Sequence, residues 1–121
     1  MSDQQSFVLY HNPRCSKSRQ ALQILHDHNI EPKTVEYLKN PPSVSELKSI
    51  LQLLGCSPRD LMRKSESLYK TLNLDDPTID DETLIKTMVE NPILIERPIV
   101  IVDQRQARVG RPPETVLELL D

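Results

Sequence analysis

A short apolar run that breaks into a helical pattern is the feature that most constrains this fold. Residues 7–10 are apolar and are followed by Asn12 and Pro13, as at the end of a buried strand that enters a turn. Apolar residues then recur at helical spacing, at Ala21, Leu22, Ile24 and Leu25. The pattern predicts a strand, a loop, and a helix that begins around residues 15–18 and continues to about residue 28.

A second strand is predicted directly after this helix. Residues 34–38 alternate, with Val35 and Tyr37 on one face, and Asn40 and two prolines end the segment. Two short strands joined by one helix pair in parallel through a right-handed crossover. We therefore expect a βαβ unit at the start of the chain.

The middle of the chain is predicted to be helical. Ser43 and Glu46 have the spacing of a capping box, an apolar stripe follows, and Gly55 marks the end of that helix. Ser57 and Pro58 are expected to begin a short helix that carries residues 61–63. A third helix is expected to begin at residue 80 and to end before residue 91.

The last third of the chain predicts a hairpin and a helix. Residues 98–102 are almost entirely apolar and β-branched, as in a central strand, and a polar turn leads to a second strand at residues 107–109. Residues 115–120 have a helical pattern. The order βαβ then ββα predicts an α/β, thioredoxin-like fold with a mixed four-stranded sheet. We expect one domain, residues 1–121, with a helical insertion at about residues 43–91.

Composition excludes several classes of function. Apolar residues make up 37% of the 121 residues, charged residues 27%, and the net charge is −3, so the chain lacks the basic footprint of a nucleic-acid or membrane-surface protein. Residues 1–6 do not resemble a signal peptide, and no apolar run is long enough to span a bilayer. We expect a cytoplasmic protein with two reduced thiols, Cys15 and Cys56, and no metal or bound cofactor.

Cys15 lies where the first loop meets the predicted helix, close in sequence to His11, Arg14, Lys17 and Arg19. Amides at a helix N-terminus and nearby cations favour a thiolate over a thiol, and they also bind oxyanions. A small buried residue at a helix start is the alternative, and residue types alone leave both open. Cys56 follows Gly55 and has few basic residues close to it in sequence, which favours a structural or surface role.

The spacing after Cys15 is Cys-x-x-Ser, with Ser18 where a dithiol motif has its second cysteine. A single thiolate can attack an electrophile, but its regeneration by exchange needs a second thiol. A reductase with this motif would borrow that thiol, for example from glutathione or glutaredoxin. No arginine lies six positions after Cys15, which counts against a phosphatase-type cysteine loop.

Three arginines are candidates for binding an oxyanion. Arg63 follows an apolar pair, Arg97 precedes Pro98, and Arg111 lies between Gly110 and a proline. Guanidinium groups grip tetrahedral oxyanions and keep their charge at any working pH. Taken singly, each arginine fits a solvated side chain or a structural ion pair better than an oxyanion ligand.

Five segments together carry a resemblance: "YHNPRCSKSR", "YLKNPP", "LMRKSE", "NPILIERPIV" and "GRPPE". In this order and spacing they resemble the ArsC-type, glutaredoxin-dependent arsenate reductases of the ArsC/Spx-like superfamily, over essentially the whole chain. The resemblance implies a thioredoxin-like fold with a helical insertion.

It also implies an activity, with arsenate or a similar oxyanion as substrate. Cys15 would attack arsenate, His11 would assist the loop, and the oxyanion would be held by Arg63, Arg97 and Arg111. Other residues of the loop are Asn12, Arg14 and Ser18. Glutathione would be the co-substrate, glutaredoxin the reducing partner, and arsenite the product; the family also implies a cis peptide bond before Pro98. We expect a monomer.

The sequence departs from the best-known members beside the nucleophile, where they carry small or neutral residues in place of Arg14, Ser16 and Lys17. The added charge would alter oxyanion access or favour an anionic thiol substrate. Two alternatives follow: a glutathione-linked reductase of another substrate, and an Spx-like regulator that binds RNA polymerase. Redox-sensing members of the Spx branch carry a CxxC pair, which Ser18 removes here.

Overall fold

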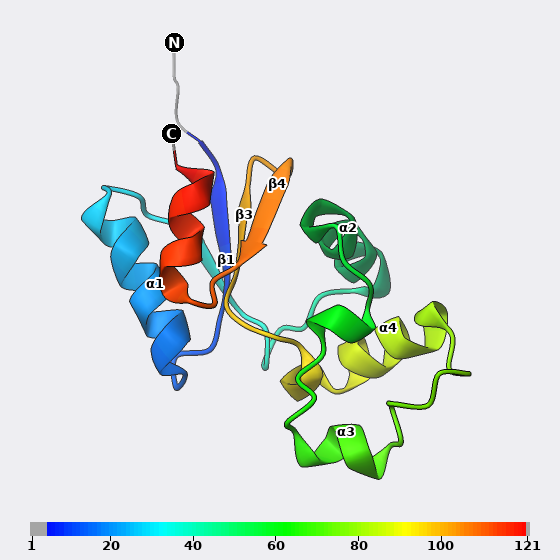
Figure 1. The fold of residues 1–121 in the computed structure, drawn as a ribbon. Helices are drawn as coiled ribbons and strands as arrows, with labels where there is room; N and C mark the ends of the chain where they lie inside the picture. Colours follow the sequence, from blue (N-terminus) through cyan, green and yellow to red (C-terminus); the bar gives the residue numbers. More distant parts are fainter. Residues whose placement is uncertain (1–4, 121) are drawn as a thin grey trace. The chain divides into compact units, whose positions relative to one another are not determined.

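The computed structural model describes residues 5–120. The chain forms two compact units (Figure 1): one from Met1–Asn40 and Arg97–Asp121, the other from Pro41–Glu96. The second unit covers the helical segment that the sequence predicts as an insertion. That the whole chain, residues 1–121, is one domain stays a prediction.

A mixed four-stranded sheet forms the first unit, as predicted. Its strands are β1 (Phe7–His11), β2 (Lys33–Glu36), β3 (Ile99–Val102) and β4 (Gln106–Val109), in the order β2-β1-β3-β4. β1 and β2 are parallel and are joined by α1 (Ser16–Asp27), whereas the β1–β3 and β3–β4 pairs are antiparallel. The predicted βαβ unit and hairpin are both confirmed.

Helices α1 and η3 (Pro113–Leu119) lie side by side along one face of this sheet (Figure 1). The predicted C-terminal helix is thus present in 3₁₀ form, and it begins at Pro113, where proline costs no helical hydrogen bond. Between these helices and the sheet lies a core of buried residues: Phe7, Leu9, Ala21, Leu25, Val100, Val102, Val116 and Leu119. Aliphatic side chains therefore supply nearly all of this core.

Three α-helices and two 3₁₀ turns make up the second unit: α2 (Val44–Leu54), η1 (Arg59–Leu61), α3 (Ser67–Thr71), α4 (Asp81–Glu90) and η2 (Pro92–Leu94). The sequence did not predict α3, which is too short to show apolar periodicity.

Both ends of α2 are capped as the sequence predicts. The amide of Glu46 donates to Ser43 Oγ at 3.1 Å, and the amide of Ser43 donates to Glu46 Oε1 at 2.8 Å. Gly55 has a φ of 68°, the left-handed conformation in which glycine is not strained. Behind these caps, Leu47 of α2 and Leu84 of α4 are fully buried.

The predicted helix over residues 57–63 is wrong in its second half. Only Arg59–Leu61 is helical, and Met62 forms an isolated antiparallel bridge with Ile95. Arg63 therefore follows an extended segment, because pairing with a distant stretch of chain replaces the helical hydrogen bonds.

The second strand is also shorter than predicted. β2 ends at Glu36, because the amides of Lys39 and Asn40 both donate to the Glu36 carbonyl at 2.9 Å and turn the chain there. Tyr37 is consequently buried from a turn and not from the sheet. Within residues 5–120, no helix is both long and apolar enough to cross a membrane.

Candidate active site

Cys15 is the N-cap residue of α1. Its backbone is extended, its amide donates to the Asn12 carbonyl at 3.0 Å, and its carbonyl accepts from the amide of Arg19 at 3.0 Å. No side chain caps this helix end, and its first turn holds no acidic residue. The first helical amides therefore direct their partial positive charge into the loop around the partly buried Cys15 thiol.

Ser18 fastens the loop to the end of β1. Its side chain is fully buried, and its Oγ lies 2.6 Å from Nδ1 of His11. The amide of Asn12 donates to the same Oγ at 3.1 Å. The serine of the Cys-x-x-Ser motif thus joins β1, the loop and α1.

The surroundings of His11 affect the protonation of its imidazole. Burial lowers the pKa of His11 and outweighs the carboxylate of Glu36, which raises it, so the imidazole is neutral at pH 7. The Ser18 hydroxyl accepts from the Asn12 amide, and toward Nδ1 of His11 it donates or accepts according to the imidazole tautomer.

His11 acts on the loop through Ser18. Within the part of the chain that the structure describes, no hydrogen bond joins His11 to the Cys15 sulfur. Asn12 adds a further loop contact, because its Oδ1 accepts from the amide of Arg14 at 3.0 Å. That His11 assists the Cys15 loop in the reaction stays a prediction.

Cations surround Cys15 as the sequence indicates. The side chains of Arg14 and Lys17 are exposed, and neither forms an ion pair among residues 5–120. Arg19 donates from Nη1 to the Pro13 carbonyl at 2.9 Å, which holds the loop against α1. The loop therefore carries two exposed cationic side chains, Arg14 and Lys17, that no ion pair among residues 5–120 neutralises.

Arg97 and Arg111 lie together in the same unit. Nη1 of Arg111 donates to the Arg97 carbonyl at 3.3 Å, and the amide of Gly110 donates to the Pro98 carbonyl at 2.8 Å. The Arg97–Pro98 bond is cis, as the resemblance implies, and Arg111–Pro112 is also cis. Nε and Nη1 of Arg97 are buried, whereas Arg111 is exposed.

The register of the sheet brings this pair to the edge where the Cys15 loop begins. Tyr10 of β1 is opposite Ile99 of β3, so the end of β1 and the start of β3 meet at one edge of the sheet. Cys15 follows β1, and Arg97 precedes β3. The Cys15 loop and the segments that carry Arg97 and Arg111 therefore lie at the same edge of the sheet. All three belong to the first unit.

Arg63 belongs to the second unit, where two carboxylates engage it. Nη1 donates to Glu66, and Nε lies 3.6 Å from Glu96 Oε1. The sequence analysis did not single out these glutamates. The three-residue spacing of Arg63 and Glu66 could have indicated the first, but no local pattern indicates the second. That Arg63 joins the other two arginines around one oxyanion stays a prediction.

Cys56 has different surroundings. Burial raises the pKa of this thiol, and the carboxylate of Asp60 raises it further. It lines a shallow hollow with α2 and α4 residues that include Lys48 and Glu82. Such a thiol is protonated at neutral pH, which fits the structural or surface role predicted for it.

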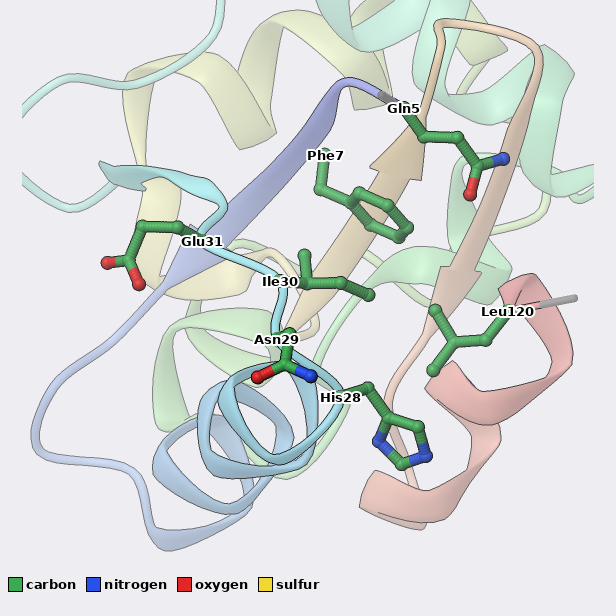
Figure 2. A pocket seen from close by; sticks show the side chains of 7 residues that line it. All are labelled: Gln5, Phe7, His28, Asn29, Ile30, Glu31 and Leu120. Carbon is green, nitrogen blue, oxygen red and sulfur yellow. The ribbon is translucent and has the colours of Figure 1, made fainter. Parts of the chain in front are cut away.

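A second hollow, of about 550 Å³, lies at the opposite end of β1 from Cys15. Figure 2 shows the apolar and polar side chains that line it: Gln5, Phe7, His28, Asn29, Ile30, Glu31 and Leu120. His28 has a structural task, because its Nδ1 lies 2.9 Å from the Ile24 carbonyl at the end of α1. No cysteine or arginine lines this hollow, so the candidate active site remains the Cys15 loop.

Residues 5–120 contain no candidate metal site. No three histidine, cysteine, aspartate or glutamate side chains gather there in a way that could hold a metal ion.

Comparison with known proteins identifies the family of this chain. The family model of the ArsC family matches residues 10–119, which include the Cys15 loop and all three arginines. The chain belongs to the ArsC family. The resemblance inferred from the five sequence segments is thereby confirmed.

Close relatives cover almost the whole chain. The arsenate reductase of Haemophilus influenzae is 48% identical over 116 residues, which are 95% of this chain and 99% of the relative. The uncharacterized protein YfgD of Escherichia coli is 51% identical over 113 residues, 93% of this chain and 94% of the relative. The same family thus includes close relatives with and without a named activity.

A solved structure, the arsenate reductase from Vibrio cholerae, matches with a TM-score of 0.94 and 51% identity. The match covers 98% of this chain and 100% of that one. The predicted α/β, thioredoxin-like fold is confirmed.

Proposed function

We propose that this protein reduces arsenate to arsenite, with Cys15 as the nucleophile and with glutathione and glutaredoxin as the source of electrons. The observation that carries the proposal is the shared sheet edge, where Cys15 at the uncapped start of α1 meets the Arg97 and Arg111 segments. Relatives that are named arsenate reductases and cover nearly the whole chain support the choice of oxyanion.

The reaction begins with the thiolate of Cys15. Its sulfur bonds to arsenic, and one arsenate oxygen leaves as water. The amides of the first turn of α1 favour the thiolate, and the fixed charges of Arg97 and Arg111 offset the charge of the oxyanion. Arg63 is the third guanidinium assigned to the oxyanion.

Two external thiols complete the cycle. Glutathione forms a second sulfur–arsenic bond and a second water leaves. The glutaredoxin thiolate then attacks the glutathione sulfur, and the electron pair of the broken sulfur–arsenic bond stays on arsenic, which is reduced from As(V) to As(III). Water cleaves the remaining bond, releasing arsenite and the Cys15 thiol. Ser18 cannot take the place of glutathione or glutaredoxin, because its hydroxyl cannot form a disulfide.

Arsenite formation with glutathione and glutaredoxin tests the proposal. Cys15→Ser should lower the rate about 1,000-fold or more, because the nucleophile is lost. Cys56→Ser is the matched control and should stay within about twofold of the wild type, since its thiol takes no part. An unchanged rate in the Cys15→Ser protein contradicts the mechanism.

The exposed cations beside Cys15 favour one other candidate. Arg14 and Lys17 fit a thiol substrate that carries carboxylates, as glutathione does. The protein would then be a glutathione-linked reductase of another electrophile. Turnover of a glutathione mixed disulfide, with no turnover of arsenate, would favour this candidate over the first.

A further inference from the structure

The edge of the sheet where the Cys15 loop begins is cationic. The strand register places the ends of β1, β2 and β4 and the start of β3 at this edge. The segments next to these strand ends carry cations: Arg14, Lys17, Arg19, Lys39, Arg97 and Arg111. Within residues 5–40 and 97–120, the acidic residues of this edge are Glu36 and Glu114. Positive charge therefore exceeds negative charge around Cys15.

The opposite edge of the same sheet has no such excess. The turn between β3 and β4 carries Asp103 and Arg105, the chain around the start of β2 carries Glu31 and Lys33, and α1 ends at Asp27. Acidic and basic residues thus accompany each other there. The positive charge of the first unit is concentrated at the edge that holds the thiol.

Arg14 and Lys17 differ from the other cations of the Cys15 edge. Arg19 donates to a loop carbonyl at 2.9 Å, Arg111 donates to a carbonyl at 3.3 Å, and Nζ of Lys39 lies 3.6 Å from a glutamate oxygen. Arg14 and Lys17 are exposed, and within the part of the chain that the structure describes neither side chain forms an ion pair or a hydrogen bond. Their charges are therefore available to a ligand in solution.

We propose that Arg14 and Lys17 make Cys15 selective for anionic thiols and disulfides, the charge class to which glutathione belongs. The inference rests on the proposed function, because it concerns the thiol partner of the same site. Arg14 directly precedes Cys15 and Lys17 follows two residues later, so their backbones lie within about 8 Å of the Cys15 α-carbon. Electrostatic attraction over such distances needs no contact, and salt screens it.

Exchange with small disulfides of different charge tests the inference without arsenate. In the Cys56→Ser protein, the Cys15 thiolate attacks one sulfur of the reagent. A mixed disulfide with Cys15 forms, the sulfur–sulfur bond of the reagent breaks, and the other half leaves as a thiolate. Oxidised glutathione is the anionic reagent, bis(2-hydroxyethyl) disulfide the neutral one and cystamine the cationic one. Mass spectrometry of the intact protein measures each rate at low salt.

The double variant Arg14→Gln with Lys17→Gln should change the selectivity in opposite directions for the two charged reagents. Relative to the neutral disulfide, the rate with oxidised glutathione should fall about fourfold and the rate with cystamine should rise by a similar factor. Each unit charge near the thiol is expected to change the encounter rate about twofold in water, so each single variant should show about half of the effect on a logarithmic scale. A change in the reactivity of the thiol itself affects all three reagents alike and cancels in these ratios.

Two controls accompany this measurement. Arg105→Gln removes an exposed arginine at the opposite edge of the sheet and should leave both ratios within about 1.5-fold of those of the parent protein, because salt screens a distant charge. At about 0.5 M salt, the ratios of the parent protein should approach those of the double variant, because the screening length falls to about 4 Å. Circular dichroism spectra that match the parent protein show that each variant is folded.

The outcomes separate this inference from the proposed function. Unchanged ratios in the double variant overturn the inference, and so does an equal fall with all three reagents, because the cations would then act on the thiolate alone. If the ratios change as expected but the wild type forms no arsenite with glutathione and glutaredoxin, the proposed arsenate activity is wrong. The selectivity for anionic thiols then stands, as a glutathione-linked reductase requires. Failure of Cys15 to react with any of the reagents contradicts both proposals.

Discussion

Cys15 and Cys56 are both partly buried free thiols, yet they lie at opposite ends of helices. Cys15 precedes α1, where unpaired amides concentrate positive charge, and Arg14 and Lys17 add to it. Cys56 follows the Gly55 cap of α2, where the helix end is negative, and Asp60 adds a carboxylate. Two partly buried thiols can therefore have different electrostatic surroundings, and for Cys56 burial and the Asp60 carboxylate raise the pKa of the thiol.

The largest expected difference is in alkylation. At pH 7, iodoacetamide should modify Cys15 at least about tenfold faster than Cys56, because the thiolate is the reacting form. Peptide mass spectrometry after timed quenching measures both sites in one sample. In urea, where the helix ends are gone, the two rates should converge. Equal alkylation rates of Cys15 and Cys56 in the folded protein would contradict the difference inferred between the two thiols.

A smaller effect is expected from Ser18→Ala. The change removes the hydroxyl that contacts His11 and Asn12, which leaves a buried ring nitrogen and a loop amide without this partner. Losses of this kind cost about 1–2 kcal/mol of folding stability, so the melting temperature should fall, and kcat/KM for arsenate should fall severalfold because the loop is less well ordered. Ser16→Ala, at the exposed first position of α1, is the control and should stay near the wild type. A Ser18→Ala protein with full activity would show that this contact does not position the loop.

The smallest effect concerns Cys56 alone. Asp60→Asn removes the negative charge that disfavours the Cys56 thiolate, so the pKa of this thiol should fall. Burial is the larger cause of its raised pKa and persists in the variant, so alkylation of Cys56 at pH 8 should rise only about two- to threefold. Mass spectrometry of the Cys15 peptide provides the internal reference, whose rate should not change. A fall in Cys56 alkylation would contradict the assigned cause.

Local signals predicted much of the fold. The β1–α1 junction, the capping box of Ser43 and Glu46, and the glycine that ends α2 all depend on residues within a few positions of one another. Features that depend on distant pairing were missed: the extended segment before Arg63 exists because Met62 pairs with Ile95.

The candidate site shows the same division. Cys15 and its basic neighbours could be predicted from the sequence because they lie on one loop. The contact of Ser18 with His11 could not, since it requires α1 to pack back against β1. Glu96 was missed as a partner of Arg63 for a similar reason, because only the tertiary fold brings the two together.

The strand order has a consequence for how this protein behaves at high concentration. β2 and β4 are the edge strands, each four residues long, and they carry Lys33 and Glu36 on one edge and Arg108 on the other. Short, charged edge strands discourage other chains from pairing with their open backbone groups. The apolar strands β1 and β3 lie between them, so the segments most prone to aggregation are paired on both sides. Replacing edge charges with valine or threonine would therefore reduce solubility before it affected the thiol chemistry.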